Sequence, residues 1–106
     1  MIKASITEDQ LKDFQRNGFL TLDKFINLKY LDELKHRIDL LFRGEFETGI
    51  EPDEWNWKSG RDPNNVTRQI CNGWKSDSLI KQVVCNPIIG QTISKLMNWK
   101  GARLVQ

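Results

Sequence analysis

The stretch TEDQLKDFQRNGFLTL, residues 7–22, determines how the chain begins to fold. Thr7 followed three positions later by Gln10 is a capping box, in which each side chain hydrogen-bonds the other residue's backbone amide at the start of a helix. Gly18 stands where a glycine ends a helix, because it adopts the left-handed conformation without steric cost. We therefore predict a helix over residues 7–17.

The next forty residues or so predict a strand, a longer helix and a loop. Strand-forming side chains dominate residues 19–25, which favours a short strand or an extended segment. Asn27 can cap a second helix that runs to about Phe42, because its apolar residues recur with a helical period. Gly44 ends this helix. The only histidine, His36, falls on the side of the helix away from its apolar face.

The second half of the chain predicts two helices between two strands. Residues 66–71 alternate like a strand, and Ser76 or Asp77 can start a short helix. The Asn-Pro pair at 86–87 suits the start of a last helix. Residues 102–106 begin another strand, and we interpret this ending as part of a longer polypeptide. The pattern predicts an α+β fold without an internal domain boundary over residues 1–106.

The segment between the second helix and the strand at residues 66–71 has no periodicity and contains Trp55 and Trp57. A long irregular segment in a compact domain is often a lid or a binding loop. The two indole rings are therefore candidates for a contact with substrate at the mouth of a site. The alternative is that they fold back onto the core and anchor the loop.

Composition excludes several classes of protein. The 16 Lys and Arg residues nearly balance the 14 Asp and Glu residues, and a net charge of +2 gives no reason to expect nucleic-acid binding. No apolar run approaches the roughly 20 residues that cross a bilayer, and no signal peptide is evident, so we expect a cytoplasmic protein without a membrane partner. Cys71 and Cys85 are expected to be free thiols. With His36 as the only imidazole, we expect no transition-metal site within the chain.

Residues 7–22 resemble the opening of the phytanoyl-CoA dioxygenase family of iron(II)- and 2-oxoglutarate-dependent oxygenases. The order of the remaining elements is similar as well, so the resemblance covers the whole chain but only the N-terminal part of the family. It implies that these helices and short strands pack on a double-stranded β-helix (jelly-roll) core lying downstream. It also implies oxidation of a small organic substrate with Fe(II) and 2-oxoglutarate in the intact enzyme.

The chain departs from the family in its metal ligands. Family members hold iron through a His-x-Asp motif and a second histidine, and this chain contains neither. We therefore expect no catalytic residue, no metal ligand and no activity from residues 1–106 alone. The alternative is a non-catalytic helical interaction module, in which the tryptophans serve packing or partner contact.

Arg68 is the strongest candidate for cofactor binding. On the predicted strand its side chain shares a face with Val66 and Ile70, and a covered cation needs a partner. One reading is a salt bridge to a loop carboxylate such as Glu51 or Asp53. The resemblance implies instead that Arg68 binds a carboxylate of 2-oxoglutarate. The C-terminal residue, Gln106, is a weaker hydrogen-bonding companion in the same predicted cofactor site.

Overall fold

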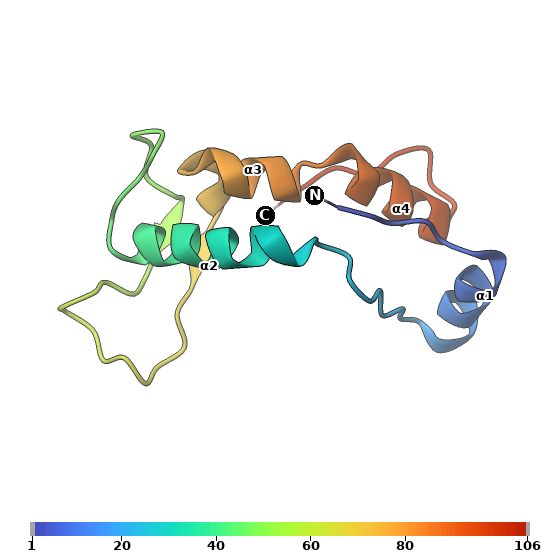
Figure 1. The fold of residues 1–106 in the computed structure, drawn as a ribbon, viewed down its shortest axis with the longest axis horizontal. Coiled ribbons are helices and arrows are strands. Elements are labelled where there is room, and N and C mark those ends of the chain that lie inside the picture. Colours follow the sequence, from blue (N-terminus) through green and yellow to red (C-terminus); the bar gives the residue numbers. More distant parts are fainter. Residues whose placement is uncertain (1, 106) are drawn as a thin grey trace.

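The computed structural model describes residues 2–105. Over this range the chain is helix-rich with one small sheet, which agrees with the predicted α+β class. The elements in chain order are α1 (Glu8–Asn17), α2 (Leu28–Phe42), β1 (Glu54–Trp55), β2 (Ile70–Cys71), the 3-10 helix η1 (Gly73–Lys75), α3 (Ser78–Val84) and α4 (Pro87–Met97). Figure 1 shows α2 beside α3, with α1 and α4 at the opposite end of the molecule from the long loop.

The predicted ends of α1 are confirmed. The Thr7 side chain accepts the Gln10 N–H at 3.1 Å, and the Gln10 side chain accepts the Thr7 N–H at 3.0 Å. Gly18 adopts the left-handed conformation with φ 78°, and its N–H donates to the Phe14 carbonyl at 2.8 Å. The capping box and the terminal glycine thus close both ends of the helix with local bonds.

The other three helices also begin at the residues that the sequence indicates. Asn27, Asp77 and Asn86 each place a side-chain oxygen within 3.1 Å of a backbone amide in the first turn of α2, α3 and α4. Asp77 rather than Ser76 is the cap of α3. These caps satisfy amides that have no partner inside the helix.

The main core lies between α2 and α3. Leu34 of α2 and Val83 of α3 are buried together with Ile2 from the N-terminal segment. Partly buried apolar side chains surround them: Phe25, Ile26, Leu79, Ile80, Ile88 and Ile89. Burial of this small cluster packs the N-terminal segment against α2, α3 and the start of α4.

Of the two alternatives for residues 19–25, the strand is wrong. No ladder forms there; a turn at residues 23–24 is followed by a single antiparallel bridge between Ile2 and Ile26. Phe19 is 67% exposed, and Lys24 has a positive φ of 53°. A strand needs a neighbour to pair its backbone groups, and the N-terminal segment supplies only this one bridge.

The two later strands are also shorter than predicted or missing. Of residues 66–71, only Ile70 and Cys71 pair, antiparallel to β1, and Val66 is 46% exposed. Residues 102–105 run along α4 without strand pairing, and Gln106 lies outside the described residues. The alternating pattern of residues 66–71 favours a strand, but within the described chain neither segment meets a partner strand of matching length.

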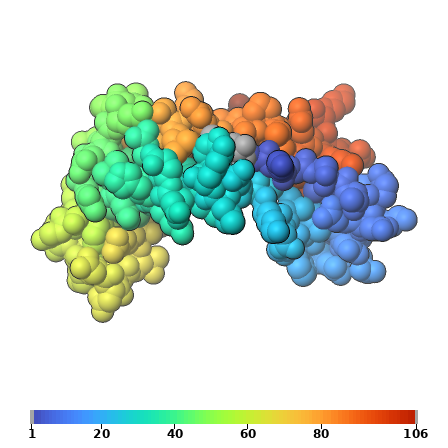
Figure 2. Space-filling view, viewed as in Figure 1, coloured from blue at the N-terminus to red at the C-terminus, as the bar shows by residue number. Residues whose placement is uncertain are grey.

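The molecule exposes more surface than a compact domain of its size. Its radius of gyration is 16.2 Å, whereas about 13 Å is typical of a domain of roughly this length. Its accessible surface is 7757 Å², roughly 1,600 Å² above the value of about 6,100 Å² expected from its mass. Figure 2 shows an elongated body with projecting lobes at its two ends.

Among residues 2–105 no helix is long and apolar enough to cross a membrane.

Candidate functional site

The start of the long loop is tied to α2 and α3 by an ion-pair cluster. Arg37 Nη2 lies 3.1 Å from Glu47 Oε2, and Arg37 Nε lies 3.1 Å from Asp77 Oδ2 without hydrogen-bond geometry. Glu47 also accepts the backbone N–H and the hydroxyl of Ser78. The Ser78 hydroxyl is the main reason that the pKa of Glu47 is below its usual value, with Arg37 adding to the effect. This cluster, Arg37–Glu47–Asp77, fixes where the loop begins.

A second set of polar contacts holds the loop near β1. Lys75 Nζ lies 2.7 Å from Asp53 Oδ1, and the Asn72 amide donates to Asp53 Oδ2 at 2.6 Å. The Lys75 hydrogen bond lowers the pKa of Asp53. Asp53 is therefore engaged by Lys75, and a salt bridge from Arg68 to Asp53 or Glu51 is not formed. That reading of Arg68 is wrong.

Arg68 lies on an aromatic surface instead. Its guanidinium carbon is 3.9 Å from the centroid of the Trp57 ring and 5.7 Å from that of Phe42. The residue is exposed, so the prediction that it shares a covered face with Val66 and Ile70 is also wrong. Within the described chain Arg68 forms no ion pair. Stacking on an indole orients the guanidinium plane and leaves its N–H groups available to a planar anion.

Trp57, the ring on which the Arg68 guanidinium lies, is itself held in place by several contacts. The side chain is 4% exposed, packs edge-on against Phe42 at 5.7 Å, and donates from Nε1 to the Pro63 carbonyl at 2.7 Å. These contacts fix the start of the loop between Trp57 and Arg68 against α2 and hold Pro63, in the middle of that loop, close to Trp57. Trp57 is therefore a packing residue that presents Arg68, rather than a ring exposed at the mouth of a site.

Trp55 also folds back onto the body of the chain. Its ring packs edge-on against Phe46 at 5.2 Å, and Lys58 Nζ lies 4.5 Å above it. Gly44 is required beneath the ring, because a Cβ there would lie 2.6 Å from Trp55 Cη2 and the glycine has φ 80°. The anchoring alternative thus describes both tryptophans. Gln106 lies outside the described residues.

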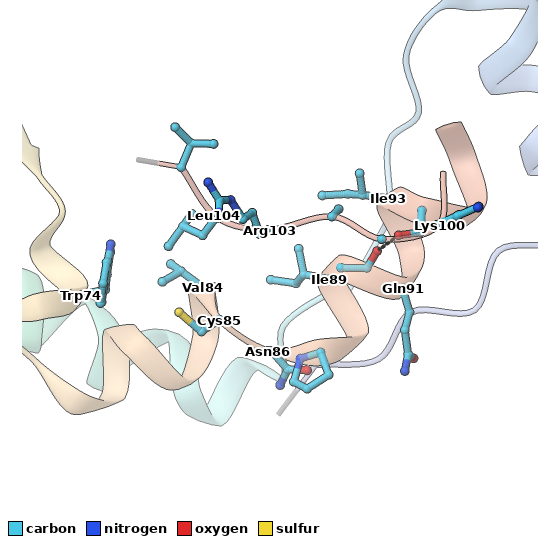
Figure 3. Close-up of a pocket in the computed structure, with 16 residues that line it drawn as sticks. Trp74, Val84, Cys85, Asn86, Ile89, Gln91, Ile93, Lys100, Arg103 and Leu104 are labelled. Atoms are coloured by element: carbon cyan, nitrogen blue, oxygen red, sulfur yellow. Dashed lines mark hydrogen bonds between the residues drawn. The ribbon is translucent and has the colours of Figure 1, made fainter. Parts of the chain in front are cut away.

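An apolar groove that the sequence did not predict lies at the C-terminal end of α3, away from the Arg37–Glu47–Asp77 cluster. It encloses about 1000 Å³ between α4 and the segment 100–105, with Trp74 at one end. In Figure 3, Val84 and Leu104 approach each other across it, and Ile89 and Ile93 face it from α4. The absence of Asp and Glu from residues 78–105 could have indicated the positive charge around this groove, but no local pattern places its apolar walls together.

The residues that commonly bind metals are dispersed. Between residues 2 and 105 no group of three or more His, Cys, Asp or Glu side chains could hold a metal ion. His36 is exposed on α2, as predicted. Cys71 is buried and Cys85 is exposed, and both are free thiols, as predicted.

Comparisons with known proteins return no match: no family model, no curated protein and no solved structure is similar to this chain.

Proposed function

We propose that residues 1–106 form the N-terminal part of a phytanoyl-CoA-dioxygenase-like oxygenase that oxidises a small organic substrate. The observation that carries this proposal is the resemblance of residues 7–22, whose capping box and terminal glycine form the expected helix. On this proposal a jelly-roll core follows downstream and covers part of the large exposed surface.

The residues of this chain do not fit an iron site. A 2-oxoglutarate oxygenase needs two imidazoles and a carboxylate on one face of the metal, and the sequence holds a single histidine. No catalytic step is therefore assigned to these residues. In the intact protein the iron would supply the oxidation chemistry, from ligands outside residues 1–106.

Arg68 is the residue of this chain proposed to bind 2-oxoglutarate. Its guanidinium rests on Trp57, is exposed, and forms no ion pair within residues 2–105. A carboxylate could accept two parallel N–H bonds from such a plane, which contributes about 1.5–3 kcal/mol, or roughly one to two decades in affinity. Gln106 is the proposed companion donor.

The first test is to determine the coding sequence downstream of residue 106. A His-x-Asp motif shortly after it, with a distant second histidine, is the expected result. A stop codon directly after Gln106 would refute the proposal.

The second test uses the protein encoded by that longer sequence. Arg68→Ala should raise the 2-oxoglutarate KM about ten- to a hundredfold while the melting temperature changes little. Arg68→Lys keeps the charge but loses the planar fork, so it should recover only part of the affinity. If KM is unchanged in Arg68→Ala while the melting temperature falls, Arg68 serves the loop and not the cosubstrate.

The second candidate function is a non-catalytic helical interaction module. The excess of roughly 1,600 Å² of accessible surface favours it, because a standard protein–protein interface buries only about 800 Å² on each partner. The downstream sequence distinguishes the two functions, since a module needs no iron ligands.

A further inference from the structure

The groove beside α4 has apolar walls from three segments. Ile89 and Ile93 line it from α4, Val84 lies at the end of α3, and Leu104 faces them from the C-terminal segment (Figure 3). Trp74 stands at the end of the groove next to Val84. Such walls favour an occupant that buries apolar side chains.

The C-terminal segment that forms one wall of the groove has backbone groups without hydrogen-bond partners in the described chain. Residues 101–105 run along α4, and at Gly90 the approach is so close that a Cβ would lie 3.3 Å from the Ala102 carbonyl oxygen. Within residues 2–105 no backbone hydrogen bond reaches residues 101–105. An occupant that covers this segment must supply backbone partners, because a buried amide or carbonyl without a partner is costly.

The rim of the groove is cationic. Residues 78–105 contain no Asp or Glu, and the residues lining the groove include Lys100 and Arg103. Lys81 lies close to Trp74 at one end, with Nζ 5.8 Å from the ring centroid. Over the described range none of these three cations forms an ion pair. A partner with carboxylates at matching positions would be attracted to this rim.

We propose that the groove binds an extended segment of a partner protein in which apolar and acidic residues alternate. The segment would add as a strand along residues 102–105, with its apolar side chains in the groove and its carboxylates toward Lys100 and Arg103. A hydrocarbon chain or a helix could fill the apolar space, but neither would supply the hydrogen bonds that the backbone of the C-terminal segment needs. The proposal does not depend on the oxygenase function.

The experiment titrates the full chain with a short labelled peptide of alternating valine and glutamate, followed by fluorescence anisotropy and amide NMR shifts. The expected result is saturable binding with shifts confined to Trp74 and residues 81–105, which form the groove and its rim. The same peptide with alternate backbone nitrogens methylated on its pairing edge should bind at least about tenfold more weakly, because it cannot pair. A valine–lysine peptide should bind at least as weakly.

Two variants test the site. Arg103→Glu should weaken the valine–glutamate peptide about fivefold or more, whereas Lys12→Glu on α1 should have little effect. Equal binding of the methylated peptide, or shifts outside the groove, would overturn strand addition. A dimer that forms through residues 102–105 and is not displaced by the peptide would assign the groove to a second copy and overturn the partner proposal.

Discussion

Replacing Asp77 with alanine removes two contacts at the junction of α2, α3 and the loop. Its Oδ1 accepts the Ile80 N–H at 3.0 Å, its Oδ2 lies 3.1 Å from Arg37 Nε, and its side chain is 3% exposed. Loss of an N-cap costs about 1 kcal/mol. Leaving Arg37, whose side chain is only 23% exposed, with fewer partners adds about 1–2 kcal/mol. We expect the free energy of unfolding to fall by about 2–3 kcal/mol.

Asp77→Asn separates the two contributions. Asparagine caps a helix as well as aspartate does, but it carries no charge for Arg37. This variant should therefore lose only the Arg37 contribution of about 1–2 kcal/mol. The assay is urea unfolding followed by circular dichroism, in which an unchanged slope shows that stability alone has changed. In a thermal scan the alanine variant should melt roughly 10–20 °C lower.

The control is Asp32→Ala on α2. Asp32 lies 3.7 Å from Lys35, its side chain is 93% exposed, and an exposed pair of this kind contributes less than about 1 kcal/mol. Equal losses from Asp77→Ala and Asp77→Asn would show that the cap contributes nothing. A loss from Asp77→Ala no larger than that from Asp32→Ala would refute the reasoning for the whole cluster.

Two further changes follow from contacts in the loop. Gly44→Ala should destabilise the chain by about 1–3 kcal/mol and shift the fluorescence of Trp55. The control, Gly49→Ala, has φ 73° and no atom near its Cβ, so it should leave that fluorescence unchanged. Equal spectra for the two variants would contradict the close packing of Trp55 on Gly44. Because the pKa of Glu47 is lowered by folding, its contribution is present above the unfolded pKa of about 4.3 and is lost as pH falls through the folded pKa. Acid titration of the melting temperature should therefore show a decline below about pH 4–5 that is reduced in Glu47→Gln; an unreduced decline would assign it to other carboxylates.

The helix boundaries could be predicted because they depend on neighbours in sequence. Thr7 and Gln10 are three positions apart, and Asn27, Asp77 and Asn86 each cap an amide two or three residues away. The position of such bonds is set by residues that are adjacent or nearly adjacent in the sequence. Local rules were therefore sufficient for all four helices.

The strands and the candidate site could not be predicted in the same way. Pairing of Glu54 with Cys71 joins residues seventeen apart, and the alternating pattern of residues 66–71 does not reveal how short the partner strand is. The wrong strand placed Arg68 on a covered face, whereas its position depends on Trp57 and on the loop between them. Contacts across a loop depend on the path of the whole loop, which no local pattern encodes.

Helix α1 has complete caps but no buried residue. A ten-residue helix is marginal by itself in water, so its persistence depends on these end bonds and on a few contacts such as Lys95 Nζ to the Ile6 carbonyl at 2.6 Å. The α2–α3 pair is held by a core that α1 does not enter. Opening of α1 should therefore occur as a separate event at low free energy, and its amides should exchange with deuterium well before those of α2. Helix α1 then unfolds and refolds reversibly while the core between α2 and α3 stays folded.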